Sequence, residues 1–162
     1  MGVDTSLRSS GIGILDRCGS RFIPVYYGTI KNPPKRPLSD CLSFIGREIA
    51  GLIDRYEPAA IAIEGIFYAK NVKTMLILAH ARGVVIERCN ECHIPVDEYE
   101  PRRVKMAVAG FGGAQKPQIQ KMVKTLLNLE EIPQNDAADA LALAMTHLHN
   151  RTSILAQTST PI

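Results

Sequence analysis

Residues 11–30 of the chain, GIGILDRCGSRFIPVYYGTI, contain two runs of β-branched and aromatic side chains separated by a polar turn. The turn covers residues 16–21 and includes Gly19, a composition that is typical of a β-hairpin. The strand-like residues MGVD at positions 1–4 precede this hairpin. The chain is therefore predicted to open with a three-stranded meander.

A helix and a different kind of strand follow the meander. After a proline-rich loop, apolar residues recur at steps of three and four between residues 38 and 56, which predicts an amphipathic helix. The run AAIAIEGI at 59–66 predicts a strand buried on both faces, and the strand–helix–strand order implies parallel pairing. Further helices are predicted at 71–90, 101–110, 115–129 and 134–149, with a strand at 94–100. Together these elements predict an α/β fold with a mixed five-stranded sheet flanked by helices.

Composition limits the class of protein. Hydrophobic residues make up 46% of the 162 residues, and no apolar run approaches the ~18 residues that span a membrane. The first ten residues show no secretory signal, so a cytoplasmic protein with reduced cysteines is expected. Residues 1–150 are predicted to form one domain and residues 151–162 a flexible tail. The net charge of +3 is compatible with a polyanionic partner but does not decide the function.

Four carboxylates are candidates for a functional site. Asp136 and Asp139 share one face at a helix start, where acids also stabilise the helix by about 0.3–1 kcal/mol. Asp4 ends the strand GVD, where its side chain could equally cap the following turn. Glu64 ends a buried strand, at the edge where α/β sheets usually bind ligands, and no cation is adjacent to it in sequence.

In a three-layer α/β fold these four acids can converge. Without a bound cation such a cluster would repel itself, so it points to a divalent metal site. Mg²⁺ prefers carboxylates together with phosphate oxygens, and two ions about 4 Å apart can stabilise the attacking and leaving oxygens of a phosphodiester. The residues therefore favour metal-dependent chemistry on a phosphodiester.

Five segments, taken in order, resemble the RuvC-type Holliday-junction resolvases of the RNase H-like superfamily. They are GVDTSLRSSGIGIL, AIEGIFYAKN, ARGV at 81–84, VK…G…QKPQIQKMV and NDAADALALA. The resemblance runs from residue 3 to about residue 150. It implies an RNase H-like fold and a structure-selective endonuclease that resolves four-way DNA junctions by metal-dependent hydrolysis in recombination and repair.

The resemblance also implies roles for individual residues. The metal-binding catalytic acids would be Asp4, Glu64, Asp136 and Asp139. Lys116 would act near the scissile phosphate and contact the DNA. Lys105 would be a DNA contact only. Phe67 matches an aromatic residue thought to stack on junction bases, with Tyr68 and Lys70 beside it as a second ring and a phosphate partner. Without the resemblance, core packing of the two rings and solvent exposure of the lysines are the alternatives.

A cofactor and partners are implied in the same way. The resemblance implies Mg²⁺, with two ions per site and Mn²⁺ as a substitute. It also implies a homodimer that binds four-way junction DNA, and a branch-migration complex as a further partner. Two symmetric sites would match the approximate two-fold symmetry of a junction. Helix 71–90, with the small residues Ala79, Ala81 and Gly83, is expected to form part of the dimer interface.

The sequence departs from the family pattern near its start. Asp4-Thr5-Ser6 stands where many members have Asp-Pro-Gly, and only three residues precede Asp4, so a short first strand and a truncated N-terminus are expectations. A non-catalytic junction-binding module and another RNase H-like nuclease are therefore kept as alternatives, with an actin-like phosphotransferase ranked last. The segment CNECH at 89–93 has haem-attachment spacing but is interpreted as structural thiols. His147 and His149, more than two turns from Asp139, are interpreted as surface or cap-side histidines.

Overall fold

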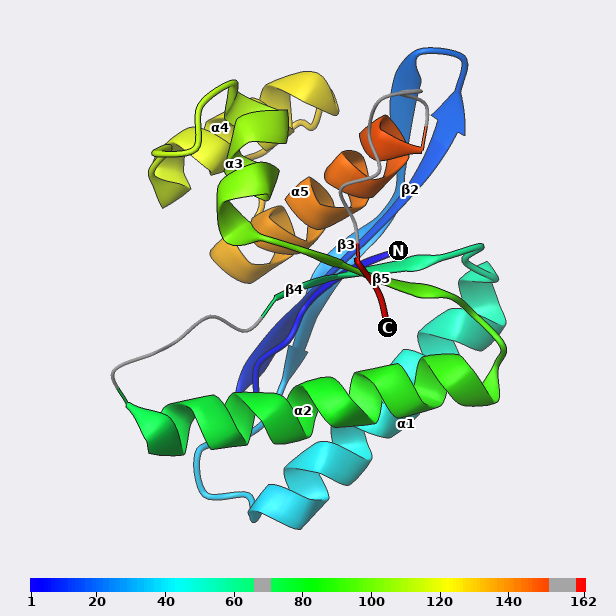
Figure 1. Ribbon diagram of the computed structural model, residues 1–162, viewed down its shortest axis with the longest axis vertical. Helices are drawn as coiled ribbons and strands as arrows, with labels where there is room; N and C mark the ends of the chain where they lie inside the picture. Colours follow the sequence, from blue (N-terminus) through cyan, green and yellow to red (C-terminus); the bar gives the residue numbers. More distant parts are fainter. Residues whose placement is uncertain (66–70, 152–159) are drawn as a thin grey trace.

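The computed structural model describes residues 1–65, 71–151 and 160–162, which form one mixed sheet between two layers of helices (Figure 1). The strands are β1 (Gly2–Asp4), β2 (Ser9–Cys18), β3 (Arg21–Lys31), β4 (Ile61–Glu64), β5 (Val96–Tyr99) and β6 (Thr160–Pro161). The helices are α1 (Leu38–Tyr56), α2 (Val72–Glu91), α3 (Pro101–Ala109), α4 (Lys116–Leu126) and α5 (Asn135–Asn150). Across the sheet the strand order is β3-β2-β1-β4-β5-β6.

The meander and the parallel strands pair as predicted. β1, β2 and β3 are antiparallel neighbours, whereas β1 pairs in parallel with β4 and β4 with β5. The hairpin turn is shorter than predicted, because residues 16–18 continue β2 and only Gly19 and Ser20 lie between the strands. Gly19 has a φ of 62°, which glycine adopts without strain. At the other edge, Thr160–Pro161 pairs antiparallel with β5, so the end of the predicted tail adds a short sixth strand.

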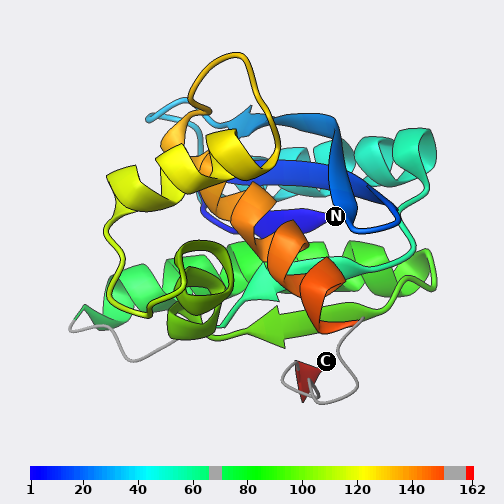
Figure 2. The ribbon, with the colours of Figure 1, turned by 90° about the horizontal axis from the view of Figure 1, so that it is seen from above.

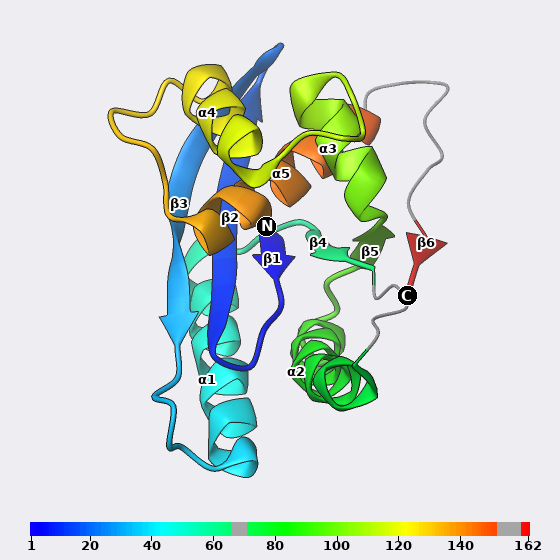
Figure 3. The same ribbon diagram turned by 90° about the vertical axis from the view of Figure 1, so that its left-hand side faces the viewer.

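Helices cover both faces of the sheet (Figure 3). An apolar core lies between each helical layer and the sheet. α1 and α2 cover one face, where Ile45 and Val85 pack with Val3 of the central strand. α3, α4 and α5 cover the other face, where Val123 and Leu141 are fully buried. In the parts of the chain that the structure describes, no helix is both long and apolar enough to cross a membrane.

α5 packs directly against β1 and β2, and glycine makes this close approach possible (Figure 2). A Cβ atom added to Gly11 would lie 1.8 Å from the backbone oxygen of Asp136. One added to Gly2 would lie 2.0 Å from the backbone oxygen of Ala140. No such atom fits, so the two strands and the helix are in backbone contact. This contact fixes the first turn of α5 beside the end of β1.

Candidate active site

Two parallel strands bring the first pair of carboxylates to one edge of the sheet. Asp4 ends β1 and Glu64 ends β4, and the register of these neighbours pairs Val3 with Ile63. The next residue of each strand is therefore a carboxylate, at the carboxyl edge where open α/β sheets bind ligands. The short first strand does not displace Asp4. The N–H of Ala62 donates to the carbonyl of Met1, so pairing with β4 extends to the residue before β1.

α5 brings the other two carboxylates to the same edge. Asp4 pairs with Gly11 across β1 and β2, and Gly11 lies against the backbone of Asp136. The hydroxyl of Ser9, in β2, donates a hydrogen bond to the carboxylate of Asp136. Asp139 follows in the next turn of the helix and lines the cavity described below. The structure thus brings together all four acids identified from the sequence, and their role as metal ligands stays a prediction.

A cavity of about 220 Å³ opens between these acids and two lysines. Its charged lining consists of Asp4, Glu64, Asp139, Lys105 and Lys116. Apolar side chains of α3, α4 and α5 form the rest of the wall. Asp136 does not line the cavity but is close enough to influence the ionisation of Asp4. The site is therefore a small acidic hollow with two ammonium groups on its wall.

Burial and neighbouring like charges oppose the ionisation of Asp4 and Glu64. Burial, followed by the charges of Glu64, Asp139 and Asp136, raises the pKa of Asp4 to about 7. Burial and the charge of Asp139 also raise the pKa of Glu64. Lys116 offsets part of this repulsion, because its Nζ lies 2.9 Å from Oδ2 of Asp139, and this hydrogen bond raises the pKa of the lysine. Asp4 and Glu64 therefore retain protons at a higher pH than ordinary carboxyl groups do.

The donor set suits a hard divalent cation. Mg²⁺ prefers carboxylate oxygens, and burial together with neighbouring acidic charges raises the pKa of Asp4, so a cation would favour its ionised form. Within the described residues, no three ligating side chains are grouped closely enough to hold an ion in the arrangement seen. Asp136 is bonded to Ser9 and Asp139 to Lys116. Binding an ion would therefore require these side chains to exchange partners.

The predicted DNA contacts fall into two groups. Lys105 on α3 and Lys116 at the start of α4 line the cavity beside the acids, as their predicted roles require. Phe67, Tyr68 and Lys70 lie outside the described residues. The expectation that the two rings stack on bases therefore stays a prediction.

Three residues that touch the acids were not identified from the sequence. Ser9 bonds the Asp136 side chain, Gly11 admits the Asp136 backbone, and the Arg82 guanidinium donates to the carbonyl of Glu64. Ser9 and Gly11 belong to the segment GVDTSLRSSGIGIL, and Arg82 belongs to ARGV. The family-like segments include these three residues. Their contacts with the acids join residues far apart in the sequence, so local sequence patterns do not predict them.

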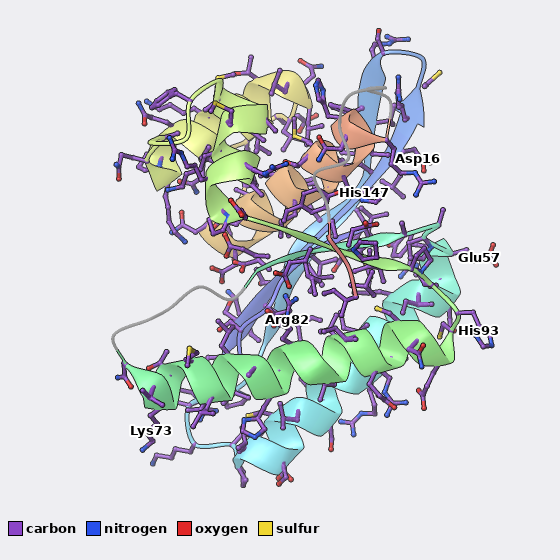
Figure 4. The ribbon with its side chains drawn as sticks, viewed as in Figure 1. Asp16, Glu57, Lys73, Arg82, His93 and His147 are labelled. Atoms are coloured by element: carbon purple, nitrogen blue, oxygen red, sulfur yellow. The ribbon has the colours of Figure 1, made fainter. Side chains whose placement is uncertain are left out.

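Of the two interpretations of His147, the surface position is wrong, whereas the position on the cap side of the helix is confirmed, because His147 lies in the last turn of α5. Only 6% of the residue is exposed, and its Nδ1 lies 2.9 Å from the hydroxyl oxygen of Tyr99. Burial lowers the pKa of His147. Figure 4 shows it near the end of α5 that is remote from Asp136. The histidine is thus part of the helix–sheet packing and not of the acidic cavity.

Both the sequence and the fold match one group of known proteins. The family model described as crossover junction endodeoxyribonuclease RuvC matches residues 1–147. The RuvC protein of Syntrophotalea carbinolica is 44% identical to this chain, over 92% of both chains. The RuvC protein of Pelotomaculum thermopropionicum is also 44% identical, over 94% of this chain and 93% of the relative. The structure of Thermus thermophilus RuvC in complex with Holliday junction substrate superimposes with a TM-score of 0.88 and 26% identity, covering 99% of this chain and 98% of that one. The chain therefore belongs to the crossover junction endodeoxyribonuclease RuvC family.

Proposed function

We propose that this crossover junction endodeoxyribonuclease hydrolyses phosphodiester bonds of four-way DNA junctions at the acidic cavity between β1, β4 and α5. The observation that carries the proposal is the convergence of Asp4, Glu64 and Asp139 with Lys116 on one cavity, with Asp136 beside it. Hard oxygen ligands next to a cation are the groups that phosphodiester hydrolysis requires. The Thermus thermophilus protein was solved with a Holliday junction, which supports the same substrate here.

The four acids would hold Mg²⁺, two ions per site, with Mn²⁺ as a substitute. When bound, the ions supply the positive charge that activates a water molecule and stabilises the departing oxygen. The chain itself keeps the ligands in place, because strand pairing fixes the backbones of Asp4 and Glu64. The contact between Gly11 and Asp136 fixes the start of α5 in the same way.

Lys116 would contribute directly to the reaction. Its ammonium lies on the cavity wall and donates to Asp139. An ammonium in this place can donate to a non-bridging phosphate oxygen and so stabilise the negative charge that develops there. We infer that Lys116 exchanges Asp139 for the phosphate when substrate and ions bind.

The basic composition of the two helices beside the cavity supports DNA as the substrate. Residues 101–129, which contain α3 and α4, carry six lysine or arginine residues and no carboxylate. Lys105 and Lys116 are the members that reach the cavity. The other members are Arg102, Arg103, Lys121 and Lys124. Phosphate contacts of this kind position a nucleic acid without reading its sequence.

The homodimer is proposed to use the exposed face of α2. Val72 and Leu76 are 61% and 54% exposed, and Ala79 and Gly83 continue the same exposed stripe. These positions follow each other at steps of four, three and four, which is the spacing of a helix–helix interface. Ala81 was expected to belong to this interface, but it is fully buried in the core of its own chain. The branch-migration complex stays an untested expectation.

Cleavage of defined substrates tests the proposed function. Labelled four-way junctions, linear duplexes and RNA–DNA hybrids of equal length would be incubated with the protein and Mg²⁺. We expect paired nicks in the junction and little cleavage of the other two substrates. Equal cleavage of the hybrid would support another RNase H-like nuclease, and binding without cleavage would support a non-catalytic junction-binding module.

A further inference from the structure

Arg82 is a charged residue in the core between α2 and the sheet. It is 7% exposed, and Figure 4 shows it between the helix and the strands. One terminal nitrogen of its guanidinium, Nη1, donates to the backbone carbonyl of Glu64 at the end of β4. The other, Nη2, forms an ion pair with the carboxylate of Glu98 on β5. One side chain therefore joins a helix to the ends of two strands.

Packing alone gives no reason to bury an arginine here. Removing a guanidinium from water is unfavourable, and burial lowers the pKa of Arg82 even though Glu98 acts in the opposite direction. A well-packed apolar side chain often stabilises a core as much as a buried ion pair does. The neighbouring Val85 fills the same helix–sheet layer with no polar group. What distinguishes Arg82 from an apolar residue is that it donates to both the Glu64 carbonyl and the Glu98 carboxylate.

The bond to Glu64 fixes one particular peptide unit. The peptide between Glu64 and Gly65 presents its carbonyl to Arg82, and its N–H donates to the carbonyl of Tyr99 over 2.9 Å. Both polar groups of this unit are thus bonded, at the point where β4 ends. Residues 66–70 follow directly and lie outside the described part of the chain. Arg82 therefore holds the carbonyl of the last peptide of β4, while Tyr99 of β5 holds its N–H.

Glu64 needs such support because its side chain stands among like charges. Glu64 lines the small cavity together with the carboxylates of Asp4 and Asp139. Repulsion between these groups favours rotation of the Glu64 backbone away from the cavity. A backbone held on both sides resists that rotation without placing a cation on the carboxylate itself.

We propose that Arg82 is a positioning residue that holds Glu64 in the orientation required for metal binding. The inference rests on the proposed function, because it assumes that Glu64 is a metal ligand. Arg82 acts through the backbone of Glu64. It does not line the cavity, and the proposed role needs no contact with the substrate. Glu98 holds the guanidinium plane so that its second nitrogen faces the Glu64 carbonyl. A lysine has one ammonium and no planar fork, so it would satisfy both acceptors less well.

Metal affinity measured without DNA separates this role from plain stability. Mn²⁺ binding to the whole protein would be followed by electron paramagnetic resonance for wild type, Arg82→Met, Arg82→Lys and Val85→Ala. We expect Arg82→Met to weaken Mn²⁺ binding ~10-fold, as the loss of groups that orient metal ligands commonly does. Arg82→Lys should recover part of the affinity. Val85→Ala should lower the melting temperature but leave Mn²⁺ affinity unchanged.

Junction experiments provide the second measurement. For Arg82→Met, the Mg²⁺ concentration that gives half-maximal nicking should also rise ~10-fold. Its affinity for the junction, measured in EDTA, should stay within about a factor of two of the wild-type affinity. Arg88→Met makes the same substitution at a half-buried position of α2 and should change neither quantity.

Two results would overturn the role of Arg82. One is wild-type Mn²⁺ affinity in a folded Arg82→Met protein, and the other is an equal loss of affinity in Val85→Ala. If Arg82→Met does not fold, Arg82→Lys decides, because wild-type Mn²⁺ affinity in that variant would also contradict the proposal. A wild-type protein that neither binds Mn²⁺ nor nicks junctions would instead contradict the proposed function.

Discussion

The ammonium of Lys116 lies 2.9 Å from Oδ2 of Asp139, so the first residue of α4 bridges the cavity to the second turn of α5. A capping box formed by Gln115 and Gln118 begins α4 and fixes the backbone of Lys116. The pair has two consequences. The lysine partly neutralises the acids, and under the proposed function it would compete with a metal ion for Asp139. We therefore expect Lys116 both to limit metal affinity and to place its ammonium near the phosphate of the substrate.

Replacement of Lys116 by glutamine should separate these two effects. We expect Lys116→Gln to bind Mn²⁺ more tightly than wild type, because a competing positive charge is removed. Junction nicking at saturating Mg²⁺ should nevertheless fall by ~100-fold, the usual effect of losing one group that stabilises transition-state charge. Single-turnover nicking and metal titration would measure the two quantities. A nicking rate close to wild type would show that Lys116 only pairs with Asp139.

The stability of the metal-free protein should depend on the ionisation of Asp4. Its pKa is about 7 in the folded chain, above the ordinary value of 3.8, so the folded state binds more protons than the unfolded state between these values. Stability should therefore fall as pH rises from 4 to 7, by at most about 4 kcal/mol from this group. Urea unfolding in EDTA at several pH values would measure this slope, and Mg²⁺ should restore stability at pH 8.

Asp4→Asn is the matched variant for the pH experiment. Asparagine keeps the size of the side chain and cannot ionise, so the fall in stability between pH 4 and 7 should become smaller. An unchanged slope in Asp4→Asn would assign the pH dependence to other groups.

Alanine at Gly11 should separate α5 from the sheet. The added Cβ would meet the backbone oxygen of Asp136 at 1.8 Å, so the helix start must move. We expect a loss of about 1–3 kcal/mol in the free energy of unfolding, as for other overpacked cores, together with a loss of nicking. Gly51→Ala is the control, because a Cβ there meets nothing within 4 Å and Gly51 lies in α1. Retained activity in Gly11→Ala would mean that the position of Asp136 tolerates displacement.

A charge on the exposed face of α2 should prevent dimer formation. Leu76→Glu places a carboxylate in the middle of the apolar stripe, and burying it in an interface without a partner is unfavourable. We expect sedimentation velocity to show a dimer for wild type and a monomer for Leu76→Glu. Leu126→Glu is the control, because Leu126 is similarly exposed but lies on α4. A dimer that survives Leu76→Glu would place the interface elsewhere.

Local patterns in the sequence predicted most of the elements. The predicted helix at 38–56 has the observed bounds of α1, because its apolar period is uninterrupted and ends near a proline. Glu64 was identified because it ends an apolar run. The family resemblance added Lys116 and Lys105, whose positions on two separate helices give no local reason to connect them.

Long-range contacts account for what the sequence did not reveal. The Ser9–Asp136 bond joins residues 127 positions apart, and Arg82 reaches Glu64 across 18. Thr160–Pro161 pairs with β5 although the surrounding sequence has no strand-like period. His147 is buried because β5 places Tyr99 against it, which the position of His147 near the end of its helix does not indicate. In each case the partner lies in another element, so tertiary packing decides the outcome.

The most direct test of the metal-dependent site is Asp136→Asn, assayed on a synthetic four-way junction with Mg²⁺. Asparagine keeps the size of the side chain and an oxygen that can accept the Ser9 bond, but it removes the charge. We predict that nicking falls by ~100-fold or more while junction binding in EDTA is retained. Asp40→Asn, at an exposed acid of α1, should nick at the wild-type rate. Wild-type nicking by Asp136→Asn would contradict the assignment of this acidic cavity as the site of hydrolysis.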